Sequence, residues 1–118
     1  MADETVYKRG DRGREVSKKL KPRRMKVRFK GRSVDISRMI TIGRDEKNDI
    51  CIKDDPLVSR RHALIEKEGD TYYLMDKGST NGTYLNNNPI PKLERVRIKS
   101  GDVVTVGKTH LEISEIEL

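Results

Sequence analysis

The chain has 118 residues, which is enough for one domain with at most a short additional segment. Charged residues make up 38% of the sequence, aromatic residues make up 4%, and Trp is absent. This composition allows only a modest apolar core, which favours short strands with alternating burial over a large enzyme scaffold. The single Cys excludes a disulfide within the chain. No apolar run approaches the roughly 18 residues of a membrane span, and the first residues lack the apolar region of a signal peptide. We therefore expect a cytoplasmic protein with no membrane partner.

The net charge of +7 is concentrated at the N-terminus. Residues 1–24 contain nine Lys or Arg and four Asp or Glu, a net of +5, whereas residues 25–118 contain seventeen and fifteen, a net of +2. The first segment has few apolar residues and no strand-like alternation, so it buries too little surface to offset the entropy lost on ordering. We predict a flexible basic tail at residues 1–24 and a folded domain at residues 25–118.

From Met25 onward the pattern is that of short strands. Apolar and polar residues alternate, and turns rich in Gly, Asn, Asp and Pro separate the runs. About ten or eleven strands follow from this pattern, among them residues 25–30, 34–36, 40–42, 50–52, 62–67, 71–76, 84–85, 95–98, 103–106 and 110–116. Residues 86–89, Asn-Asn-Asn-Pro, are predicted to form a turn. With no amphipathic helix of useful length, the sequence predicts an all-β fold, an antiparallel β-sandwich.

Arg44 opens the first of three polar clusters that fall in predicted loops. It follows the apolar strand that ends at Ile42. A guanidinium with such a fixed root can bind an oxyanion through two parallel hydrogen bonds. The alternative is an Arg that is solvated or paired with Asp45, Glu46 or Asp49.

The second cluster is Ser59-Arg60-Arg61-His62. Ser59 offers a hydroxyl to a ligand, or it caps its own turn. Arg60 and Arg61 point in opposite directions in an extended chain, so at most one of them faces the same ligand as Ser59. His62 can hydrogen-bond to loop backbone. As a catalytic base for Ser59 it would lack a nucleophile elbow and an orienting acid, so we do not expect an enzyme.

The third cluster is Gly78-Ser79-Thr80-Asn81-Gly82-Thr83. The Asn81-Gly82 pair suits a backbone with positive φ, and the Asn81 amide can bind a peptide main chain. A plain hairpin turn is the alternative. The stretch lacks the glycine and lysine pattern of a nucleotide-binding loop, and the His and Cys residues of the chain lack the spacing of metal ligands. We expect neither a cofactor nor a metal.

If the strands simply alternated in direction, the loops after Ile42 and after Ile52 would lie at opposite ends of the fold, but the second loop is long enough to return across the short strand to the first. Residues 53–61 can extend over about 30 Å. The strand before them, Asp49 to Ile52, covers only about 13 Å. The sequence therefore permits the two loops to meet.

In this order and spacing, the motifs Gly43-Arg44, Ser59-x-x-His62 and Asn81-Gly82 resemble the forkhead-associated (FHA) domain family. Members of this family are β-sandwich modules that bind phosphothreonine peptides. The resemblance covers roughly residues 25–117. Supporting matches are residues 76–83, Leu85-Asn86, Gly101-Asp102 and Val106-Gly107.

The resemblance implies a role for each matching position in the loops. It implies that Arg44 and Ser59 contact the phosphate and that Arg60 touches the phosphopeptide. Thr80 and Asn81 would hold the phosphate or the peptide backbone. The position that matches Arg60 is often occupied by a different residue elsewhere in the family, so the resemblance supports its role least.

Three further positions match architectural residues of the family. Gly43 would allow close packing, His62 would brace a loop, and Gly82 would form a turn. The implied function is phosphothreonine-dependent protein–protein interaction in kinase signalling. The implied partners are a Thr-phosphorylated protein and a Ser/Thr protein kinase.

Thr5 lies between acidic and apolar residues in the predicted tail. The resemblance adds the hypothesis that phosphorylated Thr5 occupies the site at Arg44 and Ser59, because some small bacterial members of the family carry such a threonine. The alternative is a tail that is not modified.

Two other functions of the chain stay open. The basic stretch Lys18 to Arg24 could bind nucleic acid electrostatically, although aromatic residues are not interleaved with it. The same fold could also serve as a phosphate-independent scaffold.

Overall fold

Short strands joined by turns and by a few longer loops make up the described chain, which is residues 24–116 of a computed structural model. The strands are β2 (Arg24–Phe29), β3 (Arg32–Ile36), β4 (Met39–Gly43), β5 (Ile50–Cys51), β6 (Ala63–Glu68), β7 (Thr71–Asp76), β8 (Thr83–Leu85), β9 (Asn88–Pro89), β10 (Val96–Ile98), β11 (Val103–Val106) and β12 (Thr109–Ile116). Within this range no helix is long and apolar enough to cross a membrane. The predicted tail and Thr5 lie outside the described residues, and β2 begins at Arg24, one residue before the predicted boundary.

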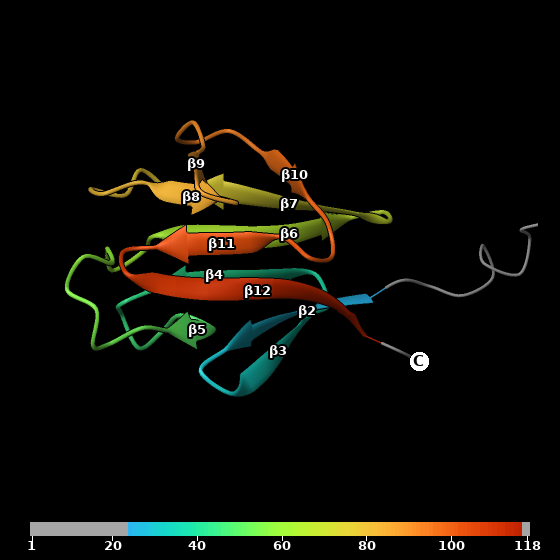
Figure 1. Cartoon of the computed structure of the whole chain (residues 1–118), viewed down its shortest axis with the longest axis horizontal. Helices are drawn as coiled ribbons and strands as arrows, with labels where there is room; N and C mark the ends of the chain where they lie inside the picture. The colour runs from blue at the N-terminus through green and yellow to red at the C-terminus, as the bar shows by residue number, and fades with distance from the viewer. Residues whose placement is uncertain (1–23, 117–118) are drawn as a thin grey trace, which may run out of the picture.

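Two sheets pack face to face (Figure 1). One has five strands in the order β10-β7-β6-β4-β5, and the other has six in the order β3-β2-β12-β11-β8-β9. The predicted all-β sandwich is confirmed. Neighbouring strands are antiparallel except β4 and β5, which run parallel, with Ile42 opposite Ile50 and Gly43 opposite Cys51.

The core follows the period-two alternation of the strands. On β7, Tyr72 and Leu74 are buried while Tyr73 and Met75 face outward. Similar alternation on the other strands brings Val27, Ile42 and other apolar side chains of both sheets together. The core is therefore thin and built mostly from Ile, Val and Leu, in keeping with the low aromatic content.

The predicted turn at residues 86–89 is in part a strand. Only Asn86 and Asn87 form the turn, and both have positive φ, 51° and 70°. A two-residue hairpin turn of this kind needs positive φ at both positions, and Asn tolerates it well. The next two residues pair with β8 as β9, with Leu85 opposite Asn88. The prediction of a turn over all four residues was therefore wrong for Asn88 and Pro89.

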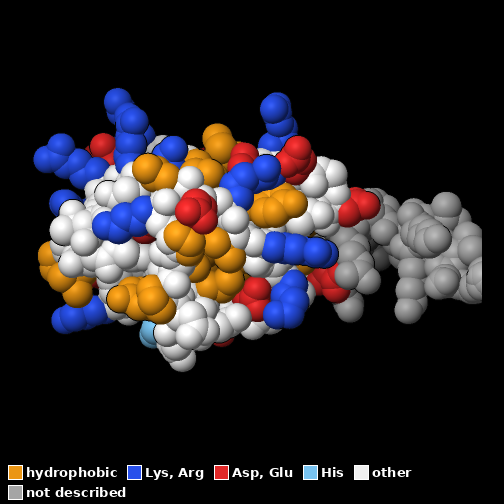
Figure 2. All heavy atoms as spheres, turned by 90° about the horizontal axis from the view of Figure 1, so that it is seen from above, with side chains coloured by type: hydrophobic (Ala, Val, Ile, Leu, Met, Phe, Trp, Pro, Cys, Tyr) orange, Lys and Arg blue, Asp and Glu red, His pale blue; other side chains and the backbone are white. Residues whose placement is uncertain are grey.

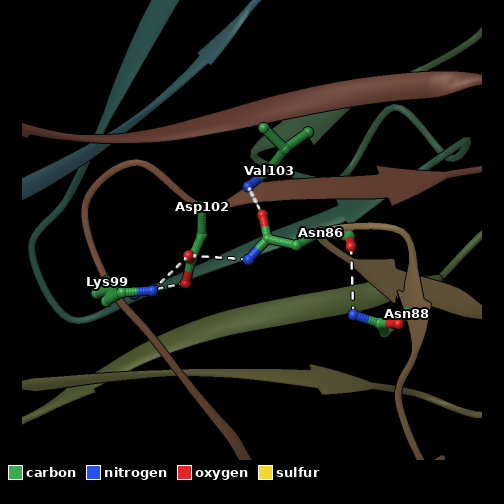
Figure 3. Close-up of polar contacts among 5 residues, drawn as sticks. All are labelled: Asn86, Asn88, Lys99, Asp102 and Val103. Carbon is green, nitrogen blue, oxygen red and sulfur yellow. Dashed lines mark hydrogen bonds and ion pairs between the residues drawn. The ribbon is translucent and has the colours of Figure 1, made fainter.

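Asn86 also connects this hairpin to the turn between β10 and β11 (Figure 3). Its side-chain nitrogen donates to Asp102 Oδ1 at 3.0 Å, and its side-chain oxygen accepts from the Val103 backbone at 2.9 Å. Asp102 in turn accepts from the backbone nitrogen of Lys99 at 2.9 Å. Burial disfavours the charged carboxylate of Asp102, but the bonds from Asn86 and Lys99 outweigh burial and lower its pKa.

The loops of interest gather at one end of the sandwich. In Figure 1 the segments that follow β4, β5 and β7 lie at the left, together with the turn between β11 and β12. The described chain begins and ends at the opposite side, where Arg24 pairs with Ile116 across the sheet. Seen from above, basic side chains are more frequent than acidic ones around the loop end (Figure 2).

Candidate functional site

The loop at residues 53–61 lies beside the end of β4, but it does not have to cross the fold to reach it. Because β4 and β5 are parallel, both strands end at the same edge of the sheet. The backbone nitrogen of Arg44 donates to the carbonyl of Ser59 at 3.0 Å. The Arg44 side chain adds a bond from Nε to the carbonyl of Val58 at 2.8 Å. The expected meeting of the first two clusters is confirmed.

Gly43 allows this approach because it has no side chain. A Cβ at this position would lie 2.1 Å from the carbonyl oxygen of Arg60. That oxygen accepts from the side-chain nitrogen of Asn48 at 2.7 Å and from the backbone nitrogen of Asp45 at 3.3 Å. Asn48 was not singled out from the sequence, yet it holds both loops, since its nitrogen also donates to the carbonyl of Asp45 at 2.8 Å.

The guanidinium of Arg44 is anchored and still available. Its Nε is used by Val58, and its side chain is exposed. Among residues 24–116 it forms no ion pair, and Asp45 and Asp49 accept instead from the backbone nitrogens of Lys47 and Thr41. The two terminal nitrogens are therefore free to bind an anion, with the direction of the side chain fixed by the Val58 bond.

Ser59 and His62 join the second loop to the third. The Ser59 hydroxyl accepts from the backbone nitrogen of Thr80 at 3.1 Å. The Ser59 backbone nitrogen donates to His62 Nδ1 at 3.0 Å, so the ring carries its proton on Nε2, which donates to the carbonyl of Gly82 at 2.8 Å. His62 is fully buried. Both ring nitrogens of His62 are thus engaged with backbone groups, as expected for a residue that braces the loops. Neither nitrogen is available to accept the proton of the Ser59 hydroxyl.

Asn81 makes a second link between the same loops. Its side-chain nitrogen donates to the carbonyl of Leu57 at 2.9 Å, and the side chain is exposed. Gly82, the next residue, has a φ of 85°, which is the left-handed region that glycine adopts most readily. The Asn81 amide oxygen faces no described hydrogen-bond donor.

Asp76 organises the third loop from below, and the sequence analysis did not identify it as a site residue. Its buried carboxylate accepts from the backbone nitrogens of Gly78 and Ser79 at 2.7 and 2.8 Å. It also accepts from the hydroxyls of Ser79 and Thr83, both at 2.6 Å. Burial disfavours the charged form, but the bonds from Ser79 and Thr83 outweigh it and lower the pKa of Asp76. The loop that carries Thr80 and Asn81 is thus folded around a carboxylate.

Asp55 anchors the second loop in the same way, and the sequence analysis also missed it. Its carboxylate accepts from the backbone nitrogen of Lys108 at 2.7 Å and from the Thr109 hydroxyl at 2.8 Å. A Cβ at Gly107 would lie 2.7 Å from this carboxylate, so the turn between β11 and β12 needs glycine there. Burial opposes ionisation of Asp55, but the bonds from Thr109 and Lys108 prevail and lower its pKa.

A pocket of about 320 Å³ opens beside these loops; we call it the loop pocket. It is lined by Arg44, Asp45, Glu46, Lys53 and Arg60. Arg44 and Arg60 thus face one cavity, whereas Arg61 lines a different one. Ser59, Thr80 and Asn81 do not line the loop pocket. Ser59 is bonded to the backbone of Arg44, Thr80 is bonded to Ser59, and Asn81 is bonded to Leu57 in the same loop as Ser59. Within residues 24–116, no three His, Cys, Asp or Glu side chains form a group that could hold a metal.

A β-sandwich with polar loops gathered at one end is an arrangement in which a rigid scaffold positions binding residues. A profile of the FHA domain family matches residues 40–107, which is more than half of the 118 residues. The chain belongs to the FHA domain family, and the resemblance drawn from its three clusters is confirmed.

Two relatives show how far the similarity extends. Over 55 residues the chain is 49% identical to the protein FraH of Nostoc sp. (strain PCC 7120), a match that covers 47% of this chain and 19% of FraH. Over 69 residues it is 45% identical to the oxoglutarate dehydrogenase inhibitor of Corynebacterium jeikeium, a match that covers 58% of this chain and 45% of that protein. In both cases the match spans less than half of the relative's length.

A similar solved structure comes from a structural and functional analysis of phosphothreonine-dependent FHA domain interactions. It superposes with a TM-score of 0.72 at 28% sequence identity, over 80% of this chain and 99% of that one.

Proposed function

We propose that this protein binds phosphothreonine in a partner protein and serves as a non-enzymatic interaction module in kinase signalling. Arg44, Ser59, Arg60, Thr80 and Asn81 are the proposed contact residues. The observation that carries the proposal is the Arg44 guanidinium, which is fixed through Nε while its terminal nitrogens stay exposed beside Arg60. Membership of the FHA family and the similarity to a protein studied for phosphothreonine-dependent interactions support it.

The hydrogen-bonding capacity left on each side chain suits a phosphopeptide. The Ser59 hydroxyl oxygen accepts from Thr80, so its own proton is available to a phosphate oxygen. A phosphothreonine side chain carries about 1.5 to 2 negative charges and three acceptor oxygens. Arg44 and Arg60 supply matching cations. Asn81 keeps its amide oxygen and one N–H for the main chain of the peptide.

The site is assembled before a ligand arrives. Bonds from Arg44, Asn48, His62 and Asn81 already tie the three loops together. Binding therefore pays little for ordering the loops, and more of the interaction energy appears as affinity. Each charge-assisted bond contributes about 1.5 to 3 kcal/mol, although such contributions are not additive. Two or three of them distinguish a phosphorylated peptide from a bare one.

The test compares a degenerate library of phosphothreonine peptides with the same library unphosphorylated. We expect a dissociation constant on the order of micromolar for preferred phosphopeptides. We expect Arg44→Ala to remove most of the preference for phosphate. Arg97→Ala, at an exposed position on β10, is the control and keeps it. Equal binding of both libraries would favour the phosphate-independent scaffold, and an unaffected Arg44→Ala variant would refute the assigned site.

The partners and location follow from the same proposal. The ligand is a protein phosphorylated on Thr, so a Ser/Thr protein kinase acts upstream of it, and the encounter takes place in the cytoplasm. Nucleic-acid binding is the competing function. Removing residues 1–23, which precede β2, separates the two, because phosphopeptide binding would survive and nucleic-acid binding through the basic segment would vanish.

Regulation by Thr5 is a separate part of the proposal. Thr5 is separated from Arg24 by nineteen residue-to-residue steps, and a coil of that length would have a root-mean-square span of about 24 Å. From its pairing with Arg24 to the turn that precedes it at the loop end, β12 covers about 26 Å with its eight residues. Phosphorylated Thr5 is therefore within reach of the loops, in the same or a neighbouring molecule. Phosphorylating Thr5 should lower the affinity for phosphopeptide or produce a dimer. If phosphorylation has neither effect, the regulation by Thr5 is refuted while the rest of the proposed function stands.

A further inference from the structure

A second pocket of about 300 Å³ lies on the outer face of the five-stranded sheet, beside the loops that follow β4 and β7. We call it the sheet pocket. It is bordered by Lys47, Arg61 and Lys77, and its floor is formed by Ala63 and Leu64 of β6. The proposed phosphothreonine contacts do not include any of these residues.

The sheet pocket carries unpaired positive charge. Lys47, Arg61 and Lys77 are exposed, and within residues 24–116 their side chains form no hydrogen bond or ion pair. Asp45 is the acidic residue of the lining, and its carboxylate already accepts from the backbone nitrogen of Lys47 at 2.9 Å. With three cations and one carboxylate, the border favours a negatively charged occupant.

The floor of the sheet pocket indicates that its occupant is partly apolar. The loop pocket differs in this respect, because all five residues that line it are charged. In the sheet pocket, by contrast, the half-buried Leu64 lies on the outer face of β6, opposite Thr41 of β4, and presents apolar surface among the cations, while the side chain of Ala63 belongs to the core on the other face. A bare phosphate would leave this surface uncovered, whereas a short segment with both acidic and apolar side chains matches the border and the floor together.

The two pockets are close enough for one ligand. Asp45 lines both of them. Arg60 and Arg61 are consecutive, and each faces one pocket. An extended peptide advances about 3.3 Å per residue, so a peptide anchored in the loop pocket reaches the sheet pocket within about six residues.

We propose that the sheet pocket binds an acidic segment with an apolar residue, such as Glu-Leu-Glu, within about six residues of the phosphothreonine on the same partner. This inference rests on the proposed function. It assigns Arg61, Lys77 and Lys47 a part in partner selection, and it makes the partner acidic next to its phosphorylation site.

The experiment uses the full chain and fluorescence anisotropy with labelled peptides. A core phosphothreonine peptide from the library is extended by Glu-Leu-Glu or by Gln-Leu-Gln, on each side in turn. The double variant Arg61→Gln with Lys77→Gln removes two border charges. The double variant Arg32→Gln with Lys92→Gln removes the same residue types from exposed positions outside both pockets and serves as the matched control.

On one side of the core, we expect the peptide with the acidic extension to bind wild-type protein about fivefold more tightly than the peptide with the neutral extension. The expected ratio is no larger because each exposed ion pair contributes little. This ratio should fall below about twofold in the variant with both pocket changes and stay near fivefold in the control. The affinity for the unextended core peptide should change equally in the two double variants.

The outcomes separate the two proposals. If the wild-type protein shows no phosphate-dependent binding of the core peptide, the proposed function fails and the inference fails with it. If the core binds normally but the ratio is near one in the wild type on both sides, only the inference is overturned. A ratio that falls equally in both double variants also overturns it, because the effect is then general electrostatics. A Lys47→Gln variant with a reduced ratio and normal core affinity would support it independently.

Discussion

Replacing Gly43 by Ala tests whether the close contact between β4 and the second loop builds the site. The new Cβ would lie 2.1 Å from the carbonyl oxygen of Arg60, and an ordinary contact begins near 3.4 Å, so the two segments must separate by more than an ångström. That movement breaks the bonds that this oxygen accepts from Asn48 and Asp45 and displaces Arg44 from Ser59. Three bonds at about 1 kcal/mol each give a loss of about 3 kcal/mol in the free energy of unfolding.

The binding site should weaken together with the fold. Because Arg44 loses its placement, we expect affinity for a phosphothreonine peptide to drop at least about tenfold, or about 1.4 kcal/mol. Urea denaturation measures the stability, and anisotropy at a temperature where the variant is folded measures the affinity.

Gly69→Ala is the matched control for this prediction. Gly69 lies in the turn between β6 and β7 with a φ of 63°, and a Cβ there would meet nothing within 4 Å. This change costs about 1 to 2 kcal/mol of backbone strain and should leave the affinity unchanged. Normal stability and affinity in Gly43→Ala would refute the packing argument. An equal loss of affinity in both variants would show that destabilisation alone weakens binding.

Three further predictions concern single side chains. Arg44→Lys keeps the charge but loses both the bond to Val58 and the paired geometry of a guanidinium, so phosphopeptide affinity should fall about tenfold by calorimetry; an unchanged affinity would show that charge alone suffices. His62→Ala should lower the free energy of unfolding by about 3 kcal/mol, because two bonds and a buried ring are lost; a loss below about 1 kcal/mol in urea would contradict the bracing role. Asp76 has a lowered pKa in the folded state, so its carboxylate stabilises the fold above the unfolded value near 4 and this contribution disappears as the pH falls through the folded value. Asp76→Asn should therefore lower the free energy of unfolding by about 2 to 3 kcal/mol at pH 7, and the stability of the variant should approach that of the wild type as the pH falls below about 4. A difference in stability that stays constant over this pH range would argue against a stabilising role of the ionised Asp76 carboxylate.

Much of the sandwich was predictable because strand burial alternates with a period of two. On β7 the sequence Thr-Tyr-Tyr-Leu-Met-Asp places alternate residues on opposite faces, and the structure follows this pattern. The three loop motifs were also recognisable, since their residue types and spacing are specific in combination.

The contacts that assemble the site were not predictable in the same way. The parallel pairing of β4 with the two-residue β5 depends on tertiary contacts, such as the bond from the Thr41 backbone to Asp49. Asp55 finds its partners 53 and 54 residues later in the chain, which no local pattern indicates. Asp76 could have been found, because an Asp followed by Gly and Ser two and three residues later is typical of a side-chain-capped turn.

Arg24 and Ile116 lie opposite each other on adjacent strands, at the end of the sandwich away from the loops. A chain that enters and leaves a domain at one point can be cut and rejoined with little loss. A short linker from Ile116 to Arg24, with new termini at the Gly69-Asp70 turn, should give a circular permutant that folds and keeps its phosphopeptide affinity. The same geometry makes the domain suitable for insertion into a surface loop of another protein, with its binding loops facing away from the host.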